Sequence, residues 1–417
     1  MIVKSMDPVN SDCPRRVLHV IGAMDRGGAE TLIMNVYRNI DRSILQFDFL
    51  VHETRECDFD SEIRALGGSI FSIDRLNGIN TVSYIKQCRD FFRTHHNYCA
   101  VHVHIGSSAY FVIKEAKKFG LFCIAHSHNT NPSLSRLESG FRLFSYPTRY
   151  IADYYLACSR EAGVDRFGNS VVASNRFSVL NNGIDVKRYK FSSESRFSMR
   201  RDLGLAPEQK AICHIGRFSD ENHEFLLKAF AKCGGGEFDG RLFLIGRGPL
   251  RNDMEQLAAE LNIRDKVVFL GVRSDIPDLL MAMDLFVFPS KWEGLGIAAI
   301  EAQASGLPCI LSPALPDMAV CSPYAYKMDS LNSTAAWAER MVDESIRADS
   351  IESMELIMGE SGFDITCCRW LPHCAVFASR SNLIGCINAC PCFRVEFLDG
   401  RSRVFYSQLC SRNSSSR

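Results

Sequence analysis

The sequence predicts an α/β fold in which two Rossmann-like, doubly wound domains face each other across a cleft, followed by an atypical C-terminal tail. Three observations support this prediction. Short apolar, β-rich runs alternate with helical patterns along most of the 417 residues. The strand runs are apolar without clean alternation, which is typical of parallel strands covered on both faces. The alternation also stops in one polar, turn-rich segment and then restarts.

The first series of elements predicts a doubly wound domain over residues 1–185. Helical patterns are expected at 28–40 ("GAETLIMNVYRNI") and around 59–66. Strands are expected at 16–24, 47–52, 69–74, 100–106, 121–128 and 154–159.

The polar segment at 181–198 marks the expected boundary, and a second domain is predicted over 186–365. Its helices are expected at 221–233 and 249–262. Its strands are expected at 210–218, 241–248, 266–272, 285–290 and 308–313. Ligands of such sheets bind outside the carboxyl ends of the strands, so the cleft between the domains is the expected site.

The remaining residues, 366–417, form a cysteine-rich tail without a sustained helical period. Cys386, Cys390 and Cys392 lack the paired Cys-x2-Cys spacing of zinc knuckles, so we do not expect a metal there. Buried free thiols, rather than disulfides, are expected for cysteines that lie singly in apolar segments, namely Cys123, Cys158, Cys213 and Cys309.

Composition narrows the class of protein. Lys+Arg and Asp+Glu are both 48, so the net charge is zero, whereas nucleic-acid binders usually carry a basic excess. No apolar run reaches the ~18–20 residues that cross a bilayer. The N-terminus "MIVKSMDPVNSDCPRR" lacks the apolar region of a signal peptide. We therefore expect a cytoplasmic protein that does not bind nucleic acid.

The stretch "FPSKWEGLGIAAIEAQASGLPCI" (288–310) has the features most typical of a ligand-binding site. A predicted strand ends there in a loop with two glycines, which let backbone N–H groups approach a ligand. The helix that follows presents free N–H groups and a positive dipole end, which favour a phosphate. Glu293 on the loop and Glu301 on the helix are eight positions apart and can accept hydrogen bonds from sugar hydroxyls. The order suits a nucleotide-sugar.

This stretch resembles the E-x7-E signature of retaining family 4 glycosyltransferases, which have the GT-B fold. Other segments follow in the family's order: "DRGGAETLIMNVYRNID", "IAHSHN", "LACSREAG", "VLNNGID", "IGRF", "LIGRGPL" and "DLLMAMDLFVFPS". The resemblance covers about residues 15–365 and is closest to bacterial enzymes that build capsular polysaccharide or exopolysaccharide.

The resemblance implies roles in the second domain, which would bind the nucleotide-sugar. Arg217 would be half of a basic clamp on the diphosphate, Glu293 would hold the donor sugar, and Glu301 would hold the ribose. The backbone N–H groups expected on sugar and phosphate are those of Gly294, Leu295, Gly296 and Ile297.

In the first domain, on the acceptor side, the resemblance places Gly27 and Gly28 in a loop that faces the donor's phosphates and the acceptor. His128, at the end of "CIAHSH", resembles the family's histidine near the sugar. His102 and His104 are expected to be hydrogen-bonded structural residues.

The clamp departs from the family at one position. Family members commonly continue "GRF" to a Lys-Asn-His, whose Lys completes the clamp. Here Glu221 precedes Asn222 and His223, and its carboxylate would repel the diphosphate unless Lys228 or Lys291 substitutes for the missing lysine.

The resemblance implies a metal-independent, retaining hexosyltransferase that needs no cofactor. The donor would be a UDP- or GDP-sugar, and the acceptor a saccharide or a polyprenyl-diphosphate-saccharide. Residues 114–118 and 136–149 interleave basic and apolar residues, which suits peripheral contact with the inner membrane surface or an ordinary amphipathic helix. The alternatives are a GT-B-type sugar-nucleotide epimerase or hydrolase, and an inactive nucleotide-sugar-binding relic.

Overall fold

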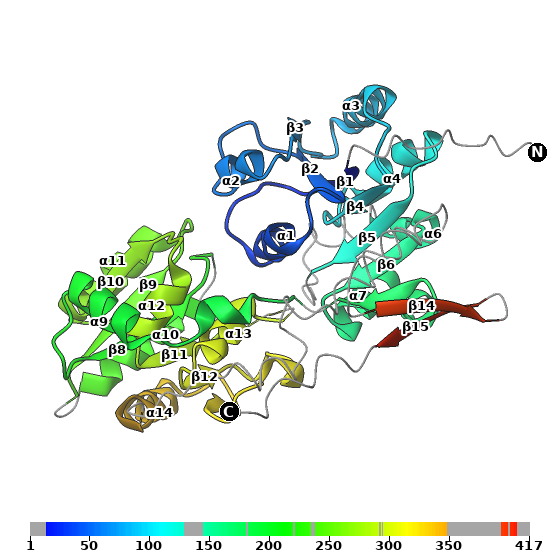
Figure 1. Cartoon of the computed structure of the whole chain (residues 1–417). Helices are drawn as coiled ribbons and strands as arrows, with labels where there is room; N and C mark the ends of the chain where they lie inside the picture. The colour runs from blue at the N-terminus through cyan, green and yellow to red at the C-terminus, as the bar shows by residue number, and fades with distance from the viewer. Residues whose placement is uncertain are drawn as a thin grey trace, which may run out of the picture.

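Two separate parallel β-sheets organise the chain, and Figure 1 shows them in different lobes. The structure is a computed structural model that describes residues 14–128, 145–180, 182–219, 222–234, 238–291, 293, 295–347, 393–398 and 401–406. The predicted α/β class and the two Rossmann-like sheets are confirmed.

The first sheet has seven strands in the order β3-β2-β1-β4-β5-β6-β7. They are β1 (Arg15–Val20), β2 (Leu45–Val51), β3 (Ile70–Ser72), β4 (Ala100–Val103), β5 (Cys123–Ser127), β6 (Tyr154–Ala157) and β7 (Phe177–Val179). The helices between them are α1 (Gly28–Asn39), α2 (Asp60–Ala65), α3 (Thr81–Thr94), α4 (Ala109–Lys118), α6 (Thr148–Ile151), α7 (Arg160–Phe167) and α8 (Asn169–Val172).

Helices cover both faces of this sheet, which explains the continuous apolar runs. Val17 of β1 packs in a cluster with Tyr37 of α1. The next residue, Leu18, belongs to a different cluster with Tyr84 of α3 and Val112 of α4. Alternate residues of one strand therefore enter two cores.

The second sheet has six strands in the order β10-β9-β8-β11-β12-β13. They are β8 (Lys210–Ile215), β9 (Gly240–Ile245), β10 (Val267–Gly271), β11 (Leu285–Phe288), β12 (Cys309–Leu311) and β13 (Ala325–Lys327). The helices are η1 (Val186–Tyr189), α9 (Ser193–Asp202), α10 (Asn222–Phe230), η2 (Ala231–Gly234), α11 (Arg251–Glu260), η3 (Arg264–Lys266), α12 (Ile276–Ala282), α13 (Ile297–Ala304), η4 (Asp317–Ala319) and α14 (Thr334–Arg347).

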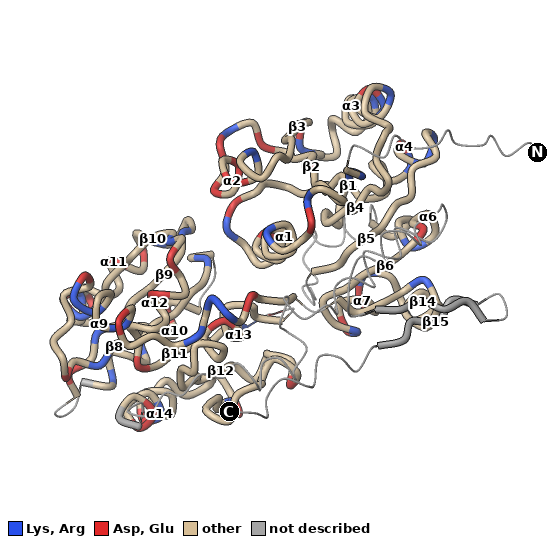
Figure 2. The backbone as a smooth tube through the Cα atoms, viewed as in Figure 1, with Lys and Arg blue, Asp and Glu red and all other residues tan. Residues whose placement is uncertain are grey.

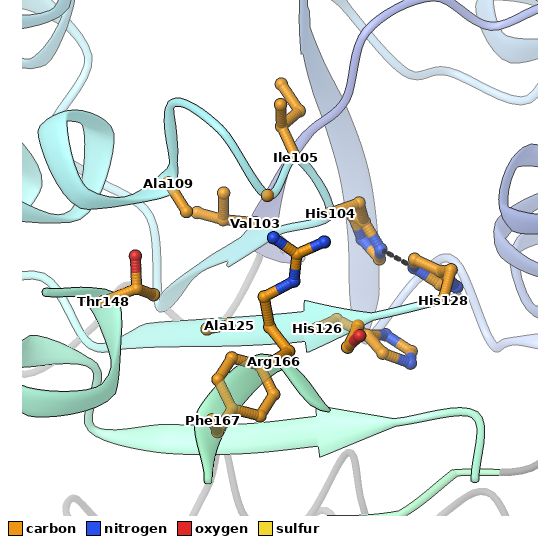
Figure 3. Close-up of a pocket in the computed structure, with 12 residues that line it drawn as sticks. Val103, His104, Ile105, Ala109, Ala125, His126, His128, Thr148, Arg166 and Phe167 are labelled. Carbon is orange, nitrogen blue, oxygen red and sulfur yellow. Dashed lines mark hydrogen bonds between the residues drawn. The ribbon is translucent and has the colours of Figure 1, made fainter. Parts of the chain in front are cut away.

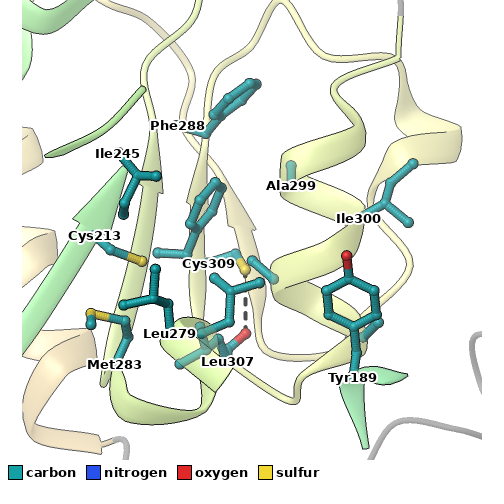
Figure 4. Packing of buried hydrophobic residues seen from close by; sticks show 14 of the residues in the cluster. Tyr189, Cys213, Ile245, Leu279, Met283, Phe288, Ala299, Ile300, Leu307 and Cys309 are labelled. Carbon is teal, nitrogen blue, oxygen red and sulfur yellow. Dashed lines mark hydrogen bonds between the residues drawn. The ribbon is translucent and has the colours of Figure 1, made fainter. Parts of the chain in front are cut away.

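This sheet is covered on both faces in the same way. Ile212 of β8 packs in a cluster with Trp337 of α14. Cys213 packs on the other face with Leu279 of α12 and Ile300 of α13, in the cluster drawn in Figure 4.

The strand order fixes where ligands can meet the sheets. In each sheet the order reverses beside the first strand, since β1 lies between β2 and β4, and β8 lies between β9 and β11. Crevices at such switch points, outside the carboxyl ends of the strands, bind ligands in open α/β sheets. A ligand-binding site is therefore expected at the loops that follow β1, β4, β8 and β11.

The segment 181–198, which was expected to be polar and turn-rich, holds η1 and the start of α9. Val186 and Tyr189 lie three residues apart on η1 and are buried against the second sheet. Because the residues between them are polar, the sequence does not reveal this short apolar face. The three-residue strands β7 and β13 were not predicted.

In the cysteine-rich tail, β14 (Phe393–Leu398) and β15 (Arg401–Tyr406) pair as an antiparallel hairpin. Cys386, Cys390 and Cys392 lie outside the described residues. All cysteines that the structure does describe are free, and Cys123, Cys158, Cys213 and Cys309 are buried as predicted.

Charges of both signs are interspersed over both lobes in Figure 2, in agreement with the zero net charge. Among the described residues, none of the helices combines the length and hydropathy that a membrane span requires.

Candidate functional site

The loop between β11 and α13 is the one whose backbone N–H groups are expected to approach a ligand closely. Gly296 caps α13 in the left-handed region, with φ 75° and ψ 62°. A Cβ at this position would lie 3.2 Å from Leu315 Cδ2. Leu295 is buried and anchors the loop, while Ile297 begins the helix. The first amides of α13 are thus held at the carboxyl edge of the second sheet. Gly294 lies outside the described residues.

Glu293 is held by its own loop and by α10. Ser290 Oγ donates a hydrogen bond of 2.8 Å to Glu293 Oε1. The amide of Lys291 donates to Asn222 Oδ1 at 3.2 Å. Asn222 and Ser290 are positioning residues that the sequence reasoning did not assign. The Asn-His pair at the start of a helix was the available signal.

Glu301 lies inside the second domain rather than at its surface. Its Oε1 accepts a hydrogen bond of 2.7 Å from the hydroxyl of Tyr189 on η1. Burial raises the pKa of Glu301 to about 7, although Tyr189 and Arg188 act in the opposite direction. This carboxyl therefore changes charge near neutral pH. Tyr189 was missed because the sequence placed it in a polar linker.

Arg217 follows β8 and is exposed. It forms no ion pair with any residue in the part of the chain that the structure describes. Its loop is tied to the next one, because Phe218 N donates to Arg247 O at 3.1 Å and Leu250 N donates to Phe218 O at 3.0 Å. A Cβ on Gly246 would come within 2.0 Å of Gly216 O, so a glycine is required where these loops meet.

Of the two possible substitutes for the missing clamp lysine, Lys228 has an ion-pair partner, and Lys291 is held through its backbone. Lys228 pairs with Glu224 on its own helix at 2.5 Å. The backbone of Lys291 is bonded to Asn222, and its side chain is partly buried. Glu221 lies outside the described residues.

The glycine loop of the first domain caps α1. Gly28 has open space where a Cβ would be, whereas a Cβ on Gly27 would lie 2.4 Å from Glu30 Oε2. Burial raises the pKa of Glu30 to about 7, with Asp25 adding to the rise. A partly protonated carboxyl repels a phosphate less than a full charge.

An ion-pair network joins this loop to the second domain. Arg247, after β9, pairs with Asp25 at 2.7 Å and with Asp58 at 3.0 Å. Asp25 also pairs with Arg55. The loop that carries Gly27 and Gly28 is thereby tied to the loop beside Arg217.

His128 follows β5 and is half-buried. Its Nε2 is hydrogen-bonded to His104 Nδ1 at 2.8 Å, as Figure 3 shows. Burial lowers the pKa of His128 to about 4, so the ring is neutral at pH 7. His102 is bonded to His126 at 3.1 Å, so His102 and His104 are hydrogen-bonded as expected.

Cys158 contacts the backbone of His128. Cys158 Sγ donates to His128 O at 3.1 Å. Burial raises the pKa of the Cys158 thiol to about 12, and the charges of Glu161 and Glu293 add to this rise.

A hollow of about 160 Å³ adjoins His128 in the first domain. It is lined by twelve residues, among them His104, His126, His128 and Arg166 (Figure 3). Glu293 does not line it, so the hollow is a feature of the first domain alone.

Comparisons with known proteins agree on one family. The model for "Glycosyl transferases group 1" matches residues 195–322, which include Arg217, Glu293 and Glu301. EpsF of Bacillus subtilis (strain 168), named as a glycosyltransferase, is 35% identical over 306 residues, which are 72% of this chain and 80% of EpsF. The UDP-Gal:alpha-D-GlcNAc-diphosphoundecaprenol alpha-1,3-galactosyltransferase of Escherichia coli is 32% identical over 141 residues, 33% of this chain and 36% of that protein.

Among solved structures, Anabaena HepE in complex with UDP and glucose superposes with a TM-score of 0.70 at 17% identity. The match covers 87% of this chain and 99% of HepE. At this identity the likeness concerns the fold, which is the GT-B arrangement of two Rossmann-like domains.

Proposed function

The chain belongs to the group 1 glycosyl transferases, and we propose that it transfers a sugar from a nucleotide-diphosphate-sugar to a growing lipid-linked glycan in bacterial cell-surface polysaccharide synthesis. One observation carries the proposal. The exposed Arg217, the first amides of α13 and Glu293 follow the carboxyl ends of strands of one sheet, and the neutral His128 follows β5 in the other sheet.

The proposed roles follow from charge. A departing nucleoside diphosphate gains negative charge as the glycosidic bond breaks, and Arg217 with the amides of Leu295, Gly296 and Ile297 would stabilise it. These groups supply positive charge without an ion, so we propose a metal-independent reaction. Gly27 and Gly28 would face the same phosphates from the first domain.

The sugars would be held by the acids and by His128. Glu293 would accept hydrogen bonds from hydroxyls of the donor sugar, and Glu301 from the ribose. His128, being neutral, can donate one ring N–H to a sugar oxygen without adding charge. We propose retention at the anomeric carbon, as in the family 4 enzymes that the signature resembles.

The donor and acceptor are proposed from relatives. HepE structures contain UDP, which favours a UDP-sugar over a GDP-sugar as the first candidate. The name of the Escherichia coli relative includes a diphosphoundecaprenol-linked sugar, which favours a polyprenyl-diphosphate-saccharide acceptor.

Contact with a membrane surface would bring the chain to such an acceptor. In the predicted basic run at 114–118, Lys117 pairs with Asp153 at 2.7 Å and Lys118 with Glu115 at 2.6 Å. Lys114 lies over the ring of Tyr110. The run therefore offers less free charge than its sequence suggests, and any binding should be weak and salt-sensitive. Most of 136–149 lies outside the described residues.

Turnover of radiolabelled UDP-sugars with and without a polyprenyl-diphosphate-saccharide tests the proposal. Labelled product that appears only with the acceptor supports a transferase. Free sugar or its epimer without acceptor would instead support the epimerase or hydrolase alternative. Tight UDP-sugar binding without turnover would support the binding relic.

A further inference from the structure

Five histidines gather at the carboxyl ends of three adjacent strands in the first domain. They are His19 of β1, His102 and His104 at the end of β4, and His126 and His128 at the end of β5. One ring nitrogen each of His104, His126 and His128 lies within 4.8 Å of the others. The rings of His126 and His128 have centroids only 4.0 Å apart.

The hydrogen bonds among these rings divide them into two sets. His104 Nδ1 faces His128 Nε2 at 2.8 Å, while His104 Nε2 faces His19 Nδ1 at 3.0 Å. His126 Nδ1 faces His102 Nε2 at 3.1 Å. His19 and His102 therefore each fix the orientation of one ring of the inner three.

We propose that His104, His126 and His128 bind a divalent transition-metal ion of the Zn²⁺ class, with His19 and His102 orienting two of these ligands. The ligand atoms would be Nδ1 of His104 and Nε2 of His126 and His128. A ligating histidine typically donates its other ring N–H to a partner, and here neighbouring imidazoles accept from His104 and His126.

The chemistry of the three rings suits such an ion. Imidazole nitrogen is a preferred ligand of Zn²⁺, Cu²⁺ and Ni²⁺. Only a neutral imidazole binds, and burial lowers the pKa of His128 to about 4 and holds that of His104 well below its ordinary value. With Zn–N bonds of about 2.0–2.1 Å, two ligands of a tetrahedral ion lie about 3.3 Å apart, so the 2.8 Å pair needs to separate only slightly.

The adjoining hollow offers the fourth position. His104, His126 and His128 all line it, and its volume of about 160 Å³ accommodates a water molecule or a small anion. Three neutral ligands leave the ion with its full double charge, and Arg166, which also lines the hollow, adds a further positive charge. The fourth ligand should therefore be hydroxide or an anion.

Binding of the ion would occupy the nitrogen of His128 that faces His104. If His128 serves the donor sugar as proposed above, its remaining nitrogen, Nδ1, would have to donate the N–H while the ion is bound. That consequence rests on the proposed function, whereas the metal site itself does not.

Anomalous diffraction at the zinc edge, from a crystal of the full chain soaked in Zn²⁺, tests the site without any substitution. A peak between His104, His126 and His128 is the expected result. Peaks found only elsewhere, for example on the cysteines of 366–417, or no peak at all, would overturn the proposal.

Titration of the metal-free full chain with Co²⁺, without donor or acceptor, gives a second readout. We expect visible absorption of a tetrahedral ion without the near-ultraviolet thiolate band. His126→Asn should abolish this signal, and His102→Gln should weaken binding by about 10- to 100-fold. The control is His214→Asn, which alters a buried histidine of the other domain that is bonded to Val287 O. An unchanged signal in His126→Asn would contradict the assignment.

Discussion

The hydroxyl of Tyr189 donates a hydrogen bond of 2.7 Å to Glu301 Oε1, which joins the start of the second domain to the helix of its glycine loop. The carboxyl is buried, and its pKa lies near 7. The proposed ribose ligand is thus also a titratable group of the core.

Tyr189→Phe removes this donor and keeps the buried aromatic ring. We expect a loss of about 0.5–1.5 kcal/mol in the free energy of unfolding. The apparent pKa of Glu301 should also rise, since the bond from Tyr189 favours the charged form. Urea denaturation and the pH dependence of UDP-glucose binding measure the two effects. Tyr154→Phe, which removes a 2.7 Å bond to Ser178 in the other domain, should affect stability only. An identical pH response in both variants would contradict the assignment.

Donor binding should tighten as the pH rises through about 7. The ribose hydroxyls donate hydrogen bonds, and an ionised Glu301 accepts them better than a protonated one. Between pH 6 and pH 8 the ionised fraction of a group with pKa 7 rises about tenfold. Calorimetry with UDP-glucose, which has no group that titrates in this range, measures the change. Glu301→Gln should bind weakly and without this pH dependence, while Glu30→Gln should retain it. A flat wild-type profile would exclude the role.

The same carboxyl affects stability with the opposite sign. Its pKa is about 7 in the folded chain against an ordinary value of 4.5, so the folded state binds more protons between these pH values. Its contribution to the free energy of unfolding is therefore complete below pH 4.5 and is lost as the pH rises to 7. Denaturation at pH 5 and pH 8 should show a smaller pH effect in Glu301→Gln than in wild type.

Gly296→Ala should damage both the fold and the donor site. The left-handed backbone costs an alanine about 1–2 kcal/mol, and its Cβ would press on Leu315. We expect a lower melting temperature and weaker UDP binding. Gly22→Ala is the control, because that position is not left-handed and has open space around a Cβ. Equal effects of the two substitutions would count against a specific loop geometry.

Arg217→Gln should weaken UDP-glucose binding by about 10- to 100-fold, because a charge-assisted hydrogen bond to phosphate is lost. Lys228→Gln should change the affinity little, since Lys228 is paired with Glu224. If Lys228→Gln proves as harmful as Arg217→Gln, then Lys228 completes the clamp.

Periodicity and apolar runs were enough to predict most strands of both sheets, because each strand is buried on two faces. They could not locate strand ends, since buried residues such as Ile21 and Met24 continue past β1 into the loop. The motif order led to Glu293 and Arg217. The bond between Tyr189 and Glu301 joins residues 112 positions apart, and the histidine cluster joins three strands. Neither the local sequence pattern nor the spacing of motifs can predict contacts between residues so far apart in the chain.

A crystal structure of the chain with UDP tests the central claim most directly. We predict the diphosphate at the first amides of α13 beside Arg217, and the ribose hydroxyls on Glu301 while Tyr189 stays bonded to it. A nucleotide bound at another place, or a Glu301 that touches only Tyr189 in the complex, would contradict the account.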